Sequence, residues 1–272
     1  MKDLKGLDTS FVAFARLAIA LPLFIPFLRL KGLSLITGVR LVLIGAVQYG
    51  VMYCLYVLAY QYIPSYQVAL FTVFTPLFVT LVNDAYLRRF EQFHFFTAII
   101  AAIGAAVILF RFDGGYDGAN VLIGFGIMQV CNLCFAFGQI EYRRLRREQP
   151  NLEDSKVFAL VYLGAVIVSG LSTHYFGGWG SAAELVKSPR QMIVLLYLGA
   201  VASGLCFFWW NKVAVKSRAG VLAVFNNMKI PLGIAISLTV FGEKADLLKL
   251  IIGSVIIGAA IWLTERHSRK QV

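Results

Sequence analysis

Nine apolar runs of about 20 residues follow one another along this chain, and each is long enough to cross a bilayer core as a helix. They lie at about 10–30, 38–60, 65–86, 93–111, 119–141, 157–176, 191–211, 219–241 and 246–264. Hydrophobic residues make up 59% of the 272 residues and charged residues 14%, whereas a soluble domain carries about a quarter charged residues. The sequence therefore predicts an all-α integral membrane protein with nine transmembrane helices.

The net charge of +11 is distributed unevenly over the loops between these runs. Most Lys and Arg residues outside the runs lie on one set of alternate loops, which includes the segment 141–156 and the C-terminus. Because cytoplasmic loops carry such an excess, we expect both segments in the cytoplasm and the N-terminus outside. This reading assigns the charge to membrane topology and predicts no nucleic-acid partner. The odd number of helices and the position of the N-terminus outside the cell also predict that a first helix is missing.

Two halves of the chain resemble each other at an offset of 154 or 155 residues. The matching landmarks are Gly45-Ala46-Val47 with Gly199-Ala200-Val201, Pro76 with Pro231, and Gly104-Ala105-Ala106 with Gly258-Ala259-Ala260. By the loop charges, the helix carrying Pro76 and the helix carrying Pro231 cross the membrane in opposite directions. We therefore expect two inverted repeats, at residues 1–118 and 119–272, a plan found in secondary transporters that bind solute between the repeats.

A lysine, Lys229, lies near the middle of the apolar run 219–241. A cation at that depth costs at least a few kcal/mol, so the chain is expected to retain it only where it faces water, a partner or a ligand. A ligand or a coupling ion is the favoured explanation. The alternative is a structural lysine paired with a carbonyl or carboxylate group inside the bundle.

Several polar and aromatic side chains within the runs are further candidates for a binding site. Tyr49, Tyr53, Tyr56 and Tyr60 share one helical face, and so do Gln129, Asn132 and Gln139. Tyrosines offer flat apolar contact and a hydrogen-bonding tip, which suits a solute with a ring. A packing stripe explains Tyr49 and Tyr53 equally well, and packing or anchoring at the membrane interface is favoured for Tyr60. Asn132 lies deepest of the three amides and is the best candidate among them, although amide bonds between helices could also satisfy it.

Two prolines mark predicted kinks. Thr72 and Thr75 precede Pro76, and Asn226 and Asn227 precede Lys229 and Pro231. Proline removes a backbone donor and frees an upstream carbonyl group. Freed carbonyls beside short polar side chains at mid-depth predict a binding niche, whereas a kink needed only for packing would explain the prolines but not the lysine.

A second cation within an apolar run, Arg16, is predicted to extend its side chain to the lipid headgroups. Attraction of an anion at an entry vestibule is the alternative. Cys131 and Cys134 have the spacing of a metal or redox pair, but no second ligand pair accompanies them, so we expect packing thiols. No metal site and no cofactor are predicted.

The chain resembles the drug/metabolite transporter superfamily over essentially its whole length, in the ten-helix form with paired EamA-type repeats. Within it the chain is most similar to the carboxylate, amino acid and amine transporters, especially the bacterial biotin importers. The residues that carry this resemblance are GAVQYGVMY at Gly45–Tyr53, LFTVFTPL at Leu70–Leu77, Asn132 with Phe135 and Ala136, YRRL at Tyr142–Leu145, VASG at Val201–Gly204, WN at Trp210–Asn211 and NNM at Asn226–Met228.

The resemblance implies a secondary transporter of the bacterial inner membrane that takes up a small carboxylate-bearing solute, biotin first, by alternating access. We expect Lys229 to pair with the carboxylate and to couple transport to protons. Asn226, Asn227 and Asn132 would hold polar groups of the solute, while Thr72 and Thr75 line the kink. Tyr49, Tyr53, Phe71 and Trp210 would pack its ring or chain.

Three alternatives remain open from the sequence. One is an exporter of amino acids or amines in the same fold, and another is a membrane scaffold or receptor that does not transport. A membrane enzyme is disfavoured, because the chain has no HExxH, GxSxG or Walker motif and lacks the paired acidic motifs of intramembrane transferases. The sequence indicates no oligomeric state.

Overall fold

A computed structural model describes residues 4, 6–63, 67–68, 71–88, 90–109, 118–228, 230–232 and 247–270. These residues form helices and connecting turns, with no strand among them. The chain divides into two compact units, one of Met1–Gln61 with Phe137–Lys216 and the other of Tyr62–Ala136 with Ser217–Val272. The predicted all-α fold is therefore confirmed for the described part.

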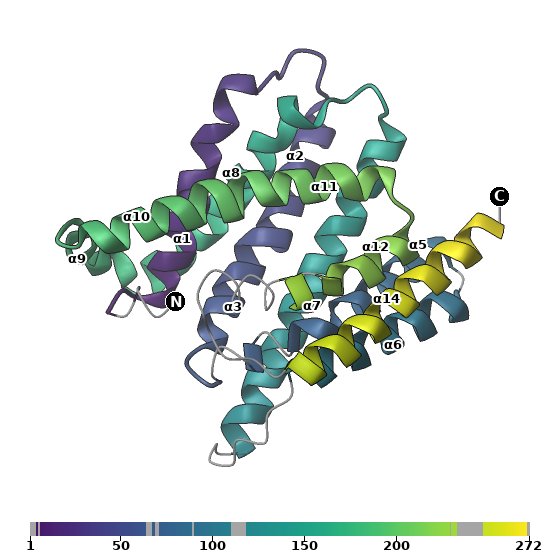
Figure 1. The fold of residues 1–272 in the computed structure, drawn as a ribbon. Coiled ribbons are helices and arrows are strands. Elements are labelled where there is room, and N and C mark those ends of the chain that lie inside the picture. The colour runs from purple at the N-terminus through teal and green to yellow at the C-terminus, as the bar shows by residue number, and fades with distance from the viewer. Residues whose placement is uncertain are drawn as a thin grey trace. The chain divides into compact units, whose positions relative to one another are not determined.

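The first unit is built from helices of two separate stretches of the chain (Figure 1). They are α1 (Thr9–Ala20), α2 (Leu35–Gly45), α3 (Met52–Ala59), α8 (Asp154–Tyr175), α9 (Ser181–Val186), α10 (Pro189–Tyr197) and α11 (Cys206–Lys216). The π-helical segment η4 (Ala46–Val51) joins α2 to α3, and η7 (Leu198–Leu205) joins α10 to α11. Each of these trios therefore forms one long helix with a wide turn in its interior.

The second unit contains the two prolines of the predicted kinks. Its helices are α5 (Thr75–Leu87), α6 (Gln92–Leu109), α12 (Ala219–Phe225) and α14 (Leu247–Lys270), while α7 (Gly118–Glu148) contributes residues to both units. A short 3₁₀ turn precedes each proline: η5 (Thr72–Phe74) before Pro76 and η8 (Asn226–Met228) before Pro231. The kinks thus take the form of tightened turns, as expected where proline interrupts the helical ladder.

Five helices are long and apolar enough to cross a membrane by length and composition: Thr9–Phe27, Leu35–Ala59, Ala119–Glu148, Asp154–Tyr175 and Pro189–Lys216. Shorter apolar helices cover Thr72–Leu87, Gln92–Gly104 and Ile251–Thr264. Eight of the nine predicted runs therefore contain an apolar helix. The structure describes residues 219–228 and 230–232 of the remaining run, where only the short helix α12 lies, so the count of nine stays a prediction.

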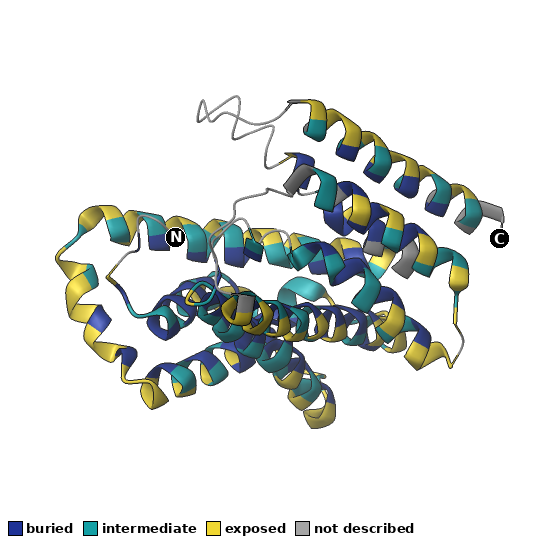
Figure 2. Cartoon of the chain, turned by 90° about the horizontal axis from the view of Figure 1, so that it is seen from below, coloured by how far each residue is buried: buried dark blue, intermediate teal, exposed yellow. Residues whose placement is uncertain are grey.

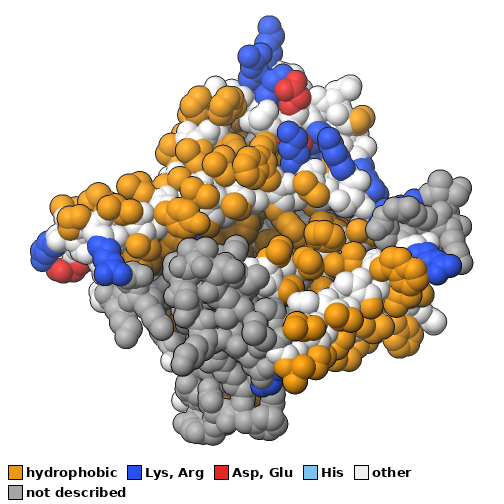
Figure 3. Space-filling view, viewed as in Figure 1, with side chains coloured by type: hydrophobic (Ala, Val, Ile, Leu, Met, Phe, Trp, Pro, Cys, Tyr) orange, Lys and Arg blue, Asp and Glu red, His pale blue; other side chains and the backbone are white. Residues whose placement is uncertain are grey.

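The outer faces of these helices are apolar. Exposed large side chains include Ile251, Val255 and Trp262 on α14 and Leu43 on α2. Figure 2 shows the exposed stripe alternating with the buried one along α14. Figure 3 shows hydrophobic side chains over the flanks of the helices, and lysine and arginine side chains gathered at the top, where the ends of α2 and α8 lie. An apolar flank with charged ends is the surface expected of a protein in a bilayer.

The internal repeat found in the sequence is also present in the backbone. When η4 is moved along the chain by 154 residues, it falls within η7, and η5 moved by the same amount coincides with η8. Each half therefore carries a wide turn and, later, a tight turn at equivalent positions. The repeat boundaries at residues 1–118 and 119–272 remain a prediction, because each compact unit takes segments from both halves.

Helices at equivalent positions in the two halves pack antiparallel. In the first unit the ring centroids of Tyr49 and Phe207 are 4.9 Å apart, and the hydroxyl oxygens of Tyr53 and Ser203 are 3.2 Å apart. Residue numbers therefore rise along one helix and fall along the other. In the second unit α6 and α14 lie side by side (Figure 1), with the Phe93 ring stacked on that of His267 at one end and Gly104 against Gly253 nearer the other. Antiparallel counterparts are what an inverted repeat requires.

Reciprocal glycine contacts bring α2 and α8 unusually close together. A Cβ atom at Gly45 would overlap the backbone carbonyl group of Val161, and one at Gly164 would overlap that of Val42. Only glycine permits backbones to approach to this distance. This contact between backbones joins α2 to α8 within the first unit.

Candidate functional site

The predicted site residues divide between the two units. Tyr49, Tyr53 and Trp210 belong to the first unit, and Phe71, Thr72, Thr75, Asn132, Asn226 and Asn227 belong to the second. Lys229, the central residue of the sequence prediction, lies outside the described residues. Each group is described separately.

In the first unit, Asn211 on α11 is the centre of a fully buried polar network. Its Nδ2 donates to the hydroxyl oxygen of Tyr49, and its Oδ1 accepts from Nε2 of Gln48 at 3.2 Å. All three side chains have no exposed surface. The Tyr49 ring also stacks between those of Phe207 and Tyr162, with centroids 4.9 and 5.8 Å away. These contacts on several sides therefore hold the Tyr49 ring in a fixed position.

Gln48 and Asn211 were not singled out as site residues from the sequence. Both are amides within apolar runs, which is the signal that could have identified them. The Gln48 Oε1 atom has no hydrogen-bond partner among the described residues, although it is completely buried. An unbonded buried acceptor costs about 1–3 kcal/mol, so this atom is a candidate contact for a donor on a solute.

Trp210 contacts the face of α7 that the sequence predicted to be polar. Its indole Nε1 donates to Oε1 of Gln139 at 2.9 Å. The Nε2 donor of this buried glutamine has no partner within the described chain. The indole of Trp210 is only half-buried. Its polar edge is therefore bonded within the protein, and its predicted contact with the solute stays a prediction.

Arg16 on α1 is buried, with only 8% of its surface exposed, so the prediction that it extends to the lipid headgroups is wrong. Its Nη2 donates to the Tyr53 hydroxyl oxygen at 2.9 Å, and its Nε donates to the Ser203 hydroxyl oxygen at 3.2 Å. The guanidinium carbon also lies 4.7 Å from the centre of the Tyr53 ring. Two partners within the protein interior hold the side chain there.

The wide turn η7 creates acceptors that the rest of the first unit uses. A π-helical turn displaces carbonyl groups from their α-helical partners. The Tyr162 hydroxyl on α8 donates to the carbonyl oxygens of Ser203 and Gly204 in this turn, the latter at 3.1 Å. The turn is therefore fixed from α8 through its backbone, while the Ser203 side chain bonds Arg16 and Tyr53.

In the second unit, Asn132 and Thr75 bond the backbone at the Pro76 kink. Pro76 has no N–H group for the Thr72 carbonyl, and the Thr75 hydroxyl donates to that carbonyl at 2.7 Å instead. The same hydroxyl oxygen lies 2.9 Å from Oδ1 of Asn132. Asn132 Nδ2 donates to the Phe71 carbonyl at 2.8 Å. These bonds between α7 and the kink are the alternative role for Asn132 that the sequence analysis left open.

Replacing Asn132 by leucine is expected to destabilise the protein by about 1–3 kcal/mol, because the partly buried Phe71 carbonyl and the buried Thr75 hydroxyl would each lose a partner. The denaturation midpoint of the purified protein in detergent measures this effect. Leu133→Ala, at an exposed position on the same helix, is the matched control and should change the midpoint little. An Asn132→Leu protein as stable as the control would contradict a structural role.

Asn226 and Asn227 are both buried in the tight turn η8. Asn227 Nδ2 donates at 3.2 Å to the carbonyl of Val73, its equivalent in the first repeat. Asn227 Oδ1 and Asn226 Nδ2 have no hydrogen-bond partner among the described residues. The two tight turns thus meet, and one buried acceptor and one buried donor remain beside them for a ligand.

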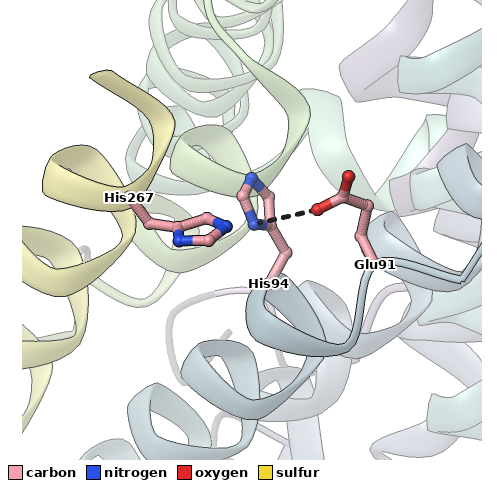
Figure 4. A group of neighbouring side chains, drawn as sticks. All are labelled: Glu91, His94 and His267. Atoms are coloured by element: carbon pink, nitrogen blue, oxygen red, sulfur yellow. Dashed lines mark ion pairs between the residues drawn. The ribbon is translucent and has the colours of Figure 1, made fainter. Parts of the chain in front are cut away.

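Three potential metal ligands meet where α6 packs on α14 (Figure 4). Glu91, His94 and His267 each offer one ligand atom, and these atoms lie within 4.8 Å of one another. The His94 Nδ1 atom is 3.9 Å from a Glu91 carboxylate oxygen, and the His267 ring stacks on Phe93. Two imidazoles and a carboxylate form a donor set that could hold zinc, although no metal site was predicted from the sequence.

Comparisons with known proteins place the chain among membrane transporters. The profile of the EamA-like transporter family matches residues 1–110. The biotin transporter of Escherichia coli is 36% identical over 257 residues, which are 94% of this chain and 83% of that protein. The biotin transporter of Salmonella typhimurium is 35% identical over 257 residues, which are 94% of this chain and 83% of that protein.

Two further comparisons cover nearly the whole chain. A probable biotin transporter of Pseudomonas aeruginosa is 36% identical over 269 residues, which are 97% of this chain and 90% of that protein. A solved crystal structure with 17% sequence identity matches the fold with a TM-score of 0.76 over 97% of this chain and 91% of the other. At that identity the structural match supports the fold alone.

Proposed function

Because the chain belongs to the EamA-like transporter family of the drug/metabolite transporter superfamily, we propose that it carries biotin into the cell. It is a multi-pass membrane protein that transports a small-molecule solute, and it is not an enzyme. The observation that carries the choice of biotin is the set of relatives named biotin transporter or probable biotin transporter, at 35–36% identity over at least 94% of the chain.

Transport proceeds by alternating access in this proposal. The repeats 1–118 and 119–272 move against each other, so that the solute site opens first to one side of the membrane and then to the other. The protein lies in a bacterial inner membrane. Its C-terminus lies in the cytoplasm, as the loop charges predict. The antiparallel packing of equivalent helices supports this mechanism.

The solute contacts follow from residue chemistry. Lys229 pairs with the carboxylate of biotin and, by gaining and losing its proton, couples transport to protons. Buried amide groups of Asn226 and Asn227 bond the polar ring, supported by the unbonded atoms found beside η8. Asn132, Thr72 and Thr75 shape the kink next to these groups, while Phe71 packs the apolar chain of the solute. Within the first unit, Tyr49, Tyr53 and Trp210 are the aromatic residues that we propose to pack the ring or chain of the solute.

Uptake of radiolabelled biotin by bacteria that lack their own biotin transporter tests this function. Cells that make the protein should accumulate label well above cells with an empty vector, and excess unlabelled biotin should compete. An amino acid should not compete. Accumulation equal to that of the vector control, with the protein present in the membrane, would contradict biotin uptake, and biotin-driven efflux from loaded cells would indicate an exporter.

A further inference from the structure

We propose that Arg16, together with the hydroxyl groups of Tyr53 and Ser203, forms a second anion site that binds the carboxylate group of the transported solute. The inference rests on the proposed function and deepens it, because Arg16 is assigned no solute contact there. It concerns the first unit only, since all three residues belong to that unit.

The charge of Arg16 is the first argument. The side chain is more than nine-tenths buried within an apolar helix that is long enough to span a membrane. It forms no ion pair with any residue that the structure describes. Its partners are two neutral hydroxyl groups and an aromatic ring. Charged groups inside membrane helices are costly and mark substrate or ion pathways. In the proposed site, the solute carboxylate supplies the negative partner that Arg16 lacks among the described residues.

The arrangement of donors is the second argument. A guanidinium has five N–H donors in a planar fork that fits a carboxylate. The hydrogen bonds of Arg16 use Nε and Nη2, and Nη1 has no hydrogen bond with the described residues. The Tyr53 hydroxyl accepts from Arg16 and lies 3.2 Å from the Ser203 hydroxyl, and only one of these two groups donates to the other. One hydroxyl hydrogen therefore stays available to an incoming oxygen.

The rigidity of the site is the third argument. Ser203 lies in the wide turn η7, which Tyr162 fixes through two carbonyl groups. The Tyr53 ring packs near that of Phe207, with centroids 5.9 Å apart. Arg16 itself donates hydrogen bonds to both Tyr53 and Ser203. Donors held before the ligand arrives bind an anion without ordering flexible side chains, and bonds to a charged group are stronger than bonds between neutral groups.

The test compares biotin with biotin methyl ester, which keeps the ring and chain but has no negative charge. Binding of each to the purified protein is measured by titration. The unmodified protein should prefer the acid by at least about tenfold, in line with charge-assisted hydrogen bonds. In Arg16→Gln this preference should fall to a few-fold, because the acid binds more weakly and the ester is little affected. Arg16→Lys, which keeps the charge but not the fork, should show an intermediate preference.

Arg190→Gln is the matched control, since Arg190 is an exposed arginine in the same unit, and it should keep the full preference. Elution as a single species in gel filtration identifies variants that have folded, and Tyr53→Phe provides a milder second variant that should also reduce the preference. An undiminished acid preference in the folded Arg16 and Tyr53 variants would overturn the inference while leaving biotin transport intact. Failure of the unmodified protein to bind biotin would instead overturn the proposed function.

Discussion

Valine in place of Gly164 is expected to prevent the first unit from folding. The added Cβ would overlap the Val42 carbonyl, which belongs to the backbone of α2 and cannot move aside by a change of rotamer. Overpacking by a side chain alone costs roughly 1–3 kcal/mol, and an overlap with backbone should exceed that range. Native proteins are stable by only about 5–15 kcal/mol, so the variant should lose most of its folded population. Gel filtration with fluorescence detection of a tagged protein measures the yield.

Gly126→Val serves as the control for this substitution. Gly126 also lies within a long helix, α7, but it is exposed and a Cβ there would have no neighbour within 4 Å. The control should elute as one folded species at nearly the normal yield. Equal yields of the two variants would show that α2 and α8 do not depend on their glycine contact.

Replacement of Lys229 by alanine is expected to reduce biotin uptake by at least tenfold without preventing folding. The reason is the loss of the charge that pairs with the solute carboxylate in the proposed mechanism. Removing a charge-assisted hydrogen bond costs about 1.5–3 kcal/mol, which corresponds to a tenfold to hundredfold loss of binding. Initial rates of labelled uptake, normalised to the amount of protein in the membrane, give the effect.

Lys229→Arg should keep part of the activity, because it preserves the positive charge but changes its shape. Lys216→Ala, at an exposed position near the end of α11, should transport normally. Full uptake by Lys229→Ala would exclude the pairing of this lysine with the carboxylate, and the lysine would then have a structural role.

The sequence predicts the helices well because apolar runs determine them. All five of the helices that are long and apolar enough to span a membrane lie where runs were found, and both proline kinks carry an altered turn. The wide turns η4 and η7 could not be predicted in the same way. Widening a helix by one residue changes the hydrogen-bond partners but hardly changes the apolar periodicity over so short a segment. Only the repeated Gly45-Ala46-Val47 and Gly199-Ala200-Val201 indicated that these positions were equivalent.

The site was predicted less completely because its contacts join distant parts of the chain. Arg16 bonds Tyr53 and Ser203, which are 37 and 187 residues away, so its burial could not be read from the neighbouring sequence. Asn132 was correctly placed among buried polar groups, but its bonds to the Pro76 kink depend on how α7 packs. An amide within an apolar run, such as Asn211, can be recognised in the sequence. Its hydrogen-bond partner Tyr49 cannot be identified there.

The matching wide turns of α2–α3 and α10–α11 also bear on how the two repeats arose. Each holds an additional residue, and the two occur at equivalent places in repeats that are otherwise much diverged. Two separate insertions at the same place would be a coincidence, whereas one insertion before duplication accounts for both.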